Sequence, residues 1–89
     1  MGTTIGNVVI SYDINKSHTQ VKDDMIDLGY FDYFTLSGSN KKYYLPNTTL
    51  WHKSKSSNQA MSDLKAVCRN LGVTLEKAIS VKASEFVGI

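Results

Sequence analysis

The sequence has one cysteine, one proline and no long apolar run. A single cysteine, Cys68, excludes an internal disulfide framework and a cysteine-rich zinc site within these 89 residues. No apolar stretch approaches the roughly 20 residues that a membrane-spanning helix needs. Residues 1–11 also lack the basic start and the long apolar segment of a signal peptide. We therefore expect a cytoplasmic protein that does not enter a membrane.

The sequence also has little net charge. Its formal value is +2 at pH 7, which is too small to indicate a nucleic-acid-binding protein by itself. A hydrophobic fraction of 42% is typical of a globular protein. A chain this short has material for one core, so we expect a single domain over residues 1–89. Such a small domain buries only about 60–65% of its unfolded surface, and a partner chain would stabilise it.

Aromatic residues are present in ordinary number, but their distribution is uneven. Seven of the nine fall between Tyr30 and Trp51. Around this segment, the pattern predicts regular elements. Residues 8–14 are rich in β-branched and aromatic residues and predict a strand, whose Val8, Ile10, Tyr12 and Ile14 should pack on helices. The other face of this strand would meet solvent or another chain.

Two helices and a last strand follow from spacing and end signals. A helix should begin after Ser17 as N-cap and end at Gly29. A second helix should begin with a capping box of Ser56 and Gln59 and end at Gly72. Residues 77–84 alternate between apolar and polar side chains and predict a strand.

Three extended pieces lie between the helices, at residues 30–36, 41–45 and 48–53. The sequence does not decide which two form central strands. We favour a hairpin of 41–45 with 48–53 through a Pro46-Asn47 turn, with 30–36 leading into it or extending its first strand.

The resulting order is strand, helix, strand, strand, helix, strand. With short connections and right-handed crossovers, this order predicts an α+β, ferredoxin-like βαββαβ fold, in which two helices cover one face of an antiparallel sheet. The other face stays open, which favours a dimer or a bound ligand.

Asp13 and His52 are the candidate catalytic residues. Asp13 stands near the end of the first strand, where a carboxylate can bind a divalent metal such as Mg²⁺. One carboxylate makes a poor magnesium site, and a two-fold dimer would supply a second. The alternative is a solvated Asp13 that accepts hydrogen bonds from the following turn. His52 could be a general base on a phosphodiester, or a half-exposed strand histidine.

A basic and aromatic edge is the candidate nucleic-acid-binding surface. Lysines beside aromatic side chains can hold phosphates and stack bases. Cross-strand packing or burial in a dimer would explain the same rings equally well. The residues of this candidate surface are Lys41, Lys42, Lys53, Lys55, Tyr44 and Trp51.

Several short motifs resemble a known superfamily. They include Ser11-Tyr12-Asp13, Leu28-Gly29, Thr49-Leu50-Trp51 and Ser56-Ser57, followed by the strand from Ala78 to Lys82. Their order is similar to that of the SinR-like branch of the superfamily of small ferredoxin-like proteins that contains the CRISPR adaptation nucleases and the VapD endoribonucleases. Residues 31–40 look like an insertion relative to this pattern.

The resemblance implies a homodimer in which Asp13 of each copy binds magnesium. The leading hypothesis is therefore a small homodimeric protein associated with nucleic acid, with a metal-dependent endonuclease or endoribonuclease activity as its enzymatic form. The alternative is a non-catalytic module that binds a protein through the open sheet face, as toxin–antitoxin proteins and phage inhibitors do. A third hypothesis is that the aromatic residues only close the dimer.

Overall fold

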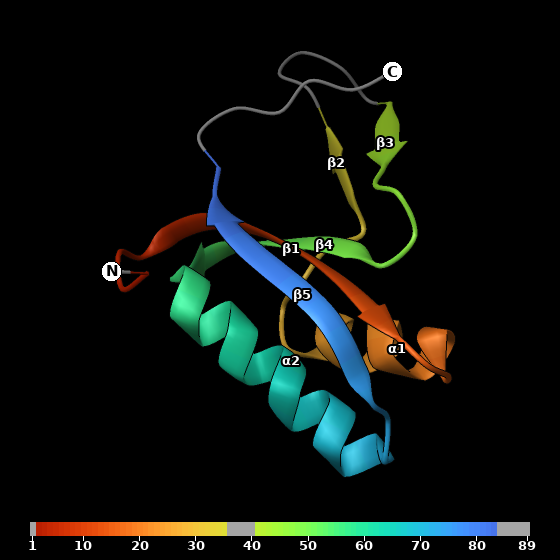
Figure 1. Ribbon diagram of the computed structural model, residues 1–89. Coiled ribbons are helices and arrows are strands. Elements are labelled where there is room, and N and C mark those ends of the chain that lie inside the picture. The colour runs from red at the N-terminus through yellow and green to blue at the C-terminus, as the bar shows by residue number, and fades with distance from the viewer. Residues whose placement is uncertain (1, 36–40, 84–89) are drawn as a thin grey trace.

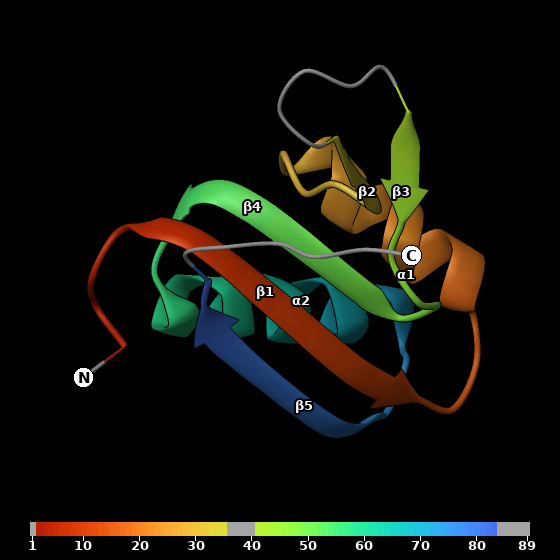
Figure 2. The same ribbon diagram turned by 90° about the horizontal axis from the view of Figure 1, so that it is seen from above.

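The computed structural model describes residues 2–35 and 41–83 and is built around one central strand. This strand, β1 (Gly6–Ile14), lies between β4 (Thr49–Lys55) and β5 (Leu75–Lys82) in a three-stranded antiparallel sheet (Figures 1 and 2). β1 takes the centre because one of its faces is apolar throughout. As predicted, its side chains on that face are buried, namely Val8, Ile10, Tyr12 and Ile14.

Both helices cover this apolar face. Figure 2 shows α1 (His18–Asp27) and α2 (Ser57–Leu71) on the same side of the sheet. α1 contributes Val21 and Met25 to the core at helical spacing, and α2 contributes Ala60, Leu64, Val67 and Cys68. The buried position of Cys68 agrees with its place on the apolar stripe of the sequence. None of the helices in the described ranges is long and apolar enough to cross a membrane.

The helix ends follow the sequence signals with one difference. Ser56 and Gln59 form the predicted capping box, and Gly72 ends α2 in the left-handed conformation at φ 67°. α1 begins after Ser17 as expected, but Ser17 itself is left-handed and its side chain makes no capping hydrogen bond. Gly29, at φ 98°, follows the last turn of α1.

A separate two-stranded unit stands at the β4 edge, and it corrects one prediction. β2 (Tyr33–Thr35) pairs antiparallel with β3 (Lys42–Tyr44), so the predicted hairpin of 41–45 with 48–53 is wrong. Two observations explain the difference. The rings of Phe34 and Tyr43 stack with centroids 5.6 Å apart, and the Leu45 N–H donates to the Asp32 carbonyl at 2.8 Å.

The segment before β2 occupies the edge of β4 that the predicted hairpin would have used. Phe31 and Trp51 form one antiparallel bridge, in which each backbone N–H donates to the other residue's carbonyl. Residues 37–40, whose serine, glycine and asparagine composition indicates a turn or loop, lie outside the described residues. The fold is therefore α+β, with two helices on one face of an antiparallel sheet, as expected. The strand order and number do not confirm the βαββαβ arrangement.

Candidate functional site

The open face of the sheet carries exposed apolar side chains. Two apolar residues of β5, Ile79 and Val81, point away from the helices and are 62% and 47% exposed, whereas Leu75 and Ala78 pack against the core. Their register partners on β1 are Ser11 and Val9, which share this face. Ser80 points the other way, and its hydroxyl donates to the Ser57 carbonyl at 2.8 Å. Exposed residues of this kind, placed side by side, are typical of a contact surface.

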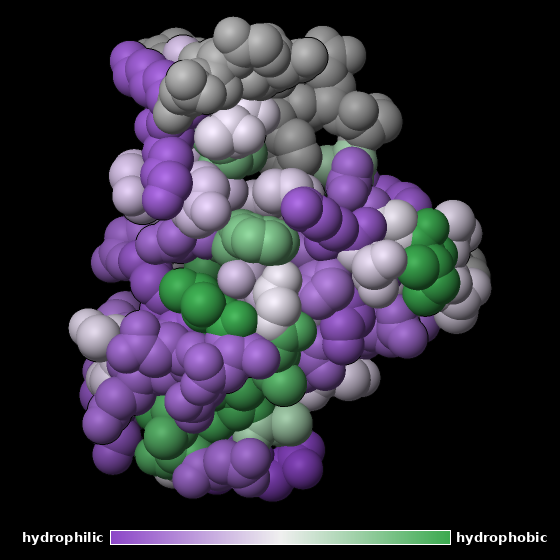
Figure 3. All heavy atoms as spheres, turned by 180° about the vertical axis from the view of Figure 1, so that it is seen from behind, coloured by the Kyte–Doolittle hydropathy of each residue, from purple (hydrophilic) through white to green (hydrophobic). Residues whose placement is uncertain are grey.

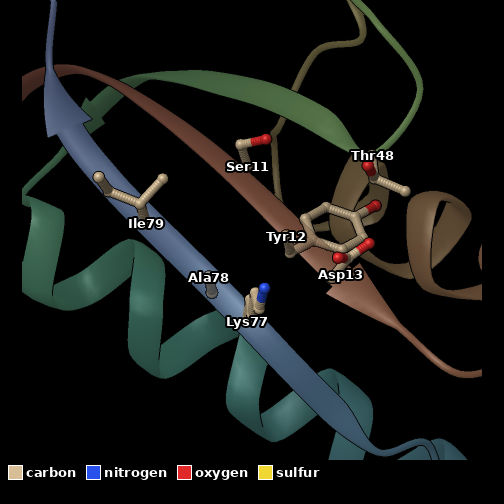
Figure 4. A pocket seen from close by; sticks show the side chains of 7 residues that line it. All are labelled: Ser11, Tyr12, Asp13, Thr48, Lys77, Ala78 and Ile79. Carbon is tan, nitrogen blue, oxygen red and sulfur yellow. The ribbon is translucent and has the colours of Figure 1, made fainter.

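Asp13 lies on the same face, at the end of β1. It lines a shallow hollow of about 350 Å³ together with Ser11, Thr48 and Ile79 (Figure 4). Lys77 is the residue directly opposite Asp13 on β5 and lines the same hollow. The hydroxyls of Ser11 and Thr49, 3.2 Å apart, continue the polar row toward β4. Asp13 is thus exposed, and a second chain on this face could reach its carboxylate.

The described residues place no further metal-binding group beside Asp13. Within residues 2–35 and 41–83, no three histidine, cysteine or acidic side chains lie together in a way that could hold a metal ion. Lys77, the register partner of Asp13 on β5, lines the same hollow and adds a positive charge to it. A magnesium ion prefers several oxygen ligands. A magnesium ion at Asp13 would therefore need further oxygen ligands from outside the described residues.

Three of the predicted phosphate-binding lysines lie over aromatic rings at the β2–β3 end. The Lys42 ammonium is 4.4 Å from the Tyr33 ring centroid, and the Lys53 ammonium is 5.1 Å from that of Phe31. Lys41 lies 5.2 Å from the Tyr43 ring. These cation–π contacts hold positive charge beside half-buried aromatic rings. Tyr44, another predicted residue, is 67% exposed on β3.

Lys55 is separated from these lysines by a bulge in β4. Val8 of β1 pairs with His52 of β4, and Gly6 pairs with Lys55. The pairing therefore moves two residues along β1 but three along β4. The extra residue breaks the alternation of side chains and turns Lys55 toward the helices. There its ammonium lies 3.0 Å from the Asp63 carboxylate. Lys55 therefore does not join the surface formed by Lys41, Lys42 and Lys53.

His52 also lies on the helix side of the sheet. Its Nδ1 accepts a hydrogen bond from the Ser54 N–H at 3.0 Å, and its ring meets the Tyr30 ring edge-on at 4.9 Å. Burial lowers the pKa of His52, while a hydrogen bond to the Leu28 backbone acts in the opposite direction. Its register partner Val8 stands five positions before Asp13 on β1, which is roughly 16 Å along a strand. His52 and Asp13 therefore do not form one catalytic centre.

The sequence reasoning missed the group of side chains around His52. Tyr30 is 1% exposed, and its hydroxyl donates to Asp63 at 2.8 Å. Burial and this hydrogen bond raise the pKa of Tyr30 well above its usual value. Asp63 also pairs with Lys55, so it joins the core tyrosine to the bulge of β4. Only the long-range register brings these residues together, and no local spacing indicates it.

Comparison of the chain with models of known protein families, with curated proteins and with solved structures found no match. The two candidate functional surfaces are therefore the open sheet face, with Ile79 and Val81, and the aromatic β2–β3 end, with Lys42 and Lys53.

Proposed function

We propose that the protein is a homodimer associated with nucleic acid, and that two copies meet through the open face of the β4-β1-β5 sheet. The observation that carries this proposal is the exposure of Ile79 and Val81 on a face that also holds Asp13. Burying apolar surface stabilises an association by roughly 25 cal/mol per Å² removed from water. A chain of 89 residues with a small core gains from such a partner.

In the full form of the proposal, the sheet is a variant of the ferredoxin-like arrangement. The order β5, β1, β4 and then the bridge at Phe31 supports this, because Phe31 stands where a fourth strand would pair with β4. The resemblance to the CRISPR adaptation and VapD nucleases then gives Asp13 a role. A two-fold axis close to Asp13 would place two carboxylates together, and these could bind one magnesium ion beside a phosphodiester.

The charge pattern favours nucleic acid as the partner. Lys42 and Lys53 hold ammonium groups over aromatic rings, and a polyanion would be attracted to them. Binding of labelled RNA or DNA oligonucleotides should weaken steeply as salt rises, because counterions are released when phosphates are neutralised. If no oligonucleotide binds even at low salt, this part of the proposal is wrong.

The catalytic form has its own test at Asp13. Labelled single-stranded and duplex RNA and DNA are incubated with Mg²⁺ and wild-type protein, Asp13→Ala or Asp13→Asn. Asp23→Ala is the control, since Asp23 is an exposed carboxylate on α1. We expect magnesium-dependent cleavage by the wild type and the control, and a loss of at least about 100-fold in both Asp13 variants. Cleavage that survives Asp13→Ala, or no cleavage of any substrate, would overturn the catalytic form.

A second candidate function is a protein-binding module without catalysis. The exposed rings and apolar residues favour it, with Tyr44 67% and Ile79 62% exposed. Aromatic side chains supply much of the binding energy at protein interfaces. This candidate predicts no salt-dependent affinity for nucleic acid. It also predicts that Tyr44→Ala weakens binding of a protein partner while the variant stays folded.

A further inference from the structure

A second hollow lies on the β4 side of the open face, away from Asp13, because Trp51 is the register partner of Val9. This aromatic cleft measures about 390 Å³, which is within the usual range for ligand pockets. Phe31, Tyr33 and Phe34 line one side, and Trp51 and Lys53 of β4 line the other, with Asn7 of β1 at one end. Figures 1 and 2 show why it forms, because the β2–β3 unit stands up from the sheet beside β4. The hollow at Asp13 shares none of these residues. The dimer proposed above would then use the β5 side of this face, with Ile79 and Val81.

The rings of the aromatic cleft are held in place by several contacts. The Trp51 indole N–H donates to the Tyr33 carbonyl at 2.6 Å. The Phe31 and Trp51 rings lie 5.2 Å apart with planes tilted by 32°, and Phe31 meets Tyr33 edge-on at 6.0 Å. The backbone bridge between Phe31 and Trp51 also fixes the main chain of both residues. Little conformational entropy would be lost when a flat ligand enters such a pre-ordered set of rings.

The charge around the aromatic cleft is positive. Lys53 comes from β4 and Lys42 from β3, so the two cations approach the rings from different strands. None of the described residues that line the cleft carries a carboxylate. Figure 3 shows the molecule from behind, where hydrophilic side chains (purple) surround smaller areas of pale and green ones. A ligand that presents a flat ring and negative charges on both sides of it would match this arrangement of rings and lysines.

We propose that the aromatic cleft binds single-stranded nucleic acid, with one unpaired base against the rings and its neighbouring phosphates at Lys42 and Lys53. This inference rests on the proposed association with nucleic acid and adds the strand type and the place. A duplex keeps its base faces stacked within the helix, so it cannot offer one to the rings. A mononucleotide offers base and phosphate too, but not a chain of phosphates that reaches lysines on two strands.

The only tryptophan of the chain, Trp51, lines the cleft and gives a direct signal. Tryptophan fluorescence is followed while wild-type protein is titrated with a 12-residue oligo-U or oligo-dT. The same titration uses that strand annealed to its complement, and then uridine monophosphate. We expect saturable quenching by the single strand, and affinities at least about tenfold weaker for the duplex and the mononucleotide. Equal affinity for either of these would overturn the proposal.

Variants test the parts of the cleft separately. Lys42→Gln and Lys53→Gln should each weaken the affinity for the single strand several-fold at low salt. Each should also lower the slope of log affinity against log salt by about one. Lys65→Gln, an exposed lysine on α2, is the matched control and should change neither. Tyr33→Leu keeps an apolar side chain without an aromatic face, and we expect its affinity for the single strand to fall by roughly five- to 100-fold. Circular dichroism checks that this variant keeps its fold.

The outcomes separate this inference from the function on which it rests. Fluorescence anisotropy of an end-labelled oligonucleotide reports binding anywhere on the protein. If anisotropy shows binding while Trp51 fluorescence does not change, nucleic acid binds elsewhere, so the inference is wrong and the proposed function stands. If anisotropy shows no binding at low salt, both are wrong.

Discussion

At the scale of single residues, two buried tyrosines differ in how their hydroxyls are satisfied. The Tyr30 hydroxyl donates to Asp63, which also holds Lys55. The Tyr12 hydroxyl is buried without a hydrogen-bond partner among the described residues. A buried polar group without a partner costs roughly 1–3 kcal/mol. The Tyr12 hydroxyl therefore lowers stability and the Tyr30 hydroxyl contributes to it, although both rings fill the same core.

This difference predicts the behaviour of Tyr12→Phe. Removing the hydroxyl should leave the free energy of unfolding at pH 7 unchanged or raise it by up to about 1 kcal/mol. Urea unfolding measures this. Tyr30→Phe is the comparison and should lose about 1 kcal/mol or more, because the Asp63 carboxylate then keeps Lys55 but loses the tyrosine donor. A loss above about 1 kcal/mol in Tyr12→Phe would show that its hydroxyl has a partner in solution.

The wild type and Tyr12→Phe should also differ in how their stability depends on high pH. Burial raises the pKa of Tyr12 to about 12, whereas an unfolded tyrosine titrates near the ordinary value of 10.0. The folded state thus favours the protonated form, and this part of the stability is present below pH 10 and is lost as pH rises from 10 toward 12. Urea midpoints should fall less steeply over this range in Tyr12→Phe than in the wild type. Equal slopes would contradict the raised pKa.

At the scale of elements, the two helix ends use glycine for different reasons. Gly72 ends α2 at φ 67°, and a Cβ added there would meet no atom within 4 Å. Gly29 follows α1 at φ 98°, and a Cβ there would lie 2.8 Å from Nε2 of His52. Position 29 therefore needs glycine both for its backbone conformation and for the close approach of β4 to the end of α1.

Alanine at these two positions gives a matched comparison. Gly72→Ala should cost about 1–2 kcal/mol from the left-handed backbone alone. Gly29→Ala should cost at least about 1 kcal/mol more, because His52 must also move. Urea unfolding of both variants, and of Gly29→Ala combined with His52→Ala, measures how much of the lost stability comes from the contact between the added Cβ and His52. If the second substitution recovers none of the extra loss, the contact with His52 is not its cause.

The elements with a strong local signal could be predicted from the sequence. β1 follows from the alternation of Val8, Ile10, Tyr12 and Ile14, and α2 follows from its capping box and Gly72. The pairing of residues 41–45 could not be predicted, because it depends on ring contacts such as Phe34 with Tyr43, which no local pattern encodes. The bulge before Lys55 was missed for the same reason, since it shows only in the register against β1.

At the scale of the whole molecule, the two faces of the sheet differ in what covers them. Helices cover the face with Val8 and Ile10, whereas the described residues place no helix over the face with Ile79 and Val81. The sequence predicted an open face and a dimer, and it placed Asp13 on that face. It did not predict that Ile79 and Val81 of β5 would lie on the open face, because alternation alone does not say which side of a strand is covered.

The dimer is the central claim, and the molar mass in solution tests it most directly. Light scattering over a dilution series is measured for the wild type, for Ile79→Lys and for Ile26→Lys. Ile26 is the control because it is 39% exposed on α1, away from the open face. We expect about twice the 9.9 kDa of one chain for the wild type and for Ile26→Lys, and a single chain for Ile79→Lys. A wild-type mass of 9.9 kDa at every concentration would contradict the account.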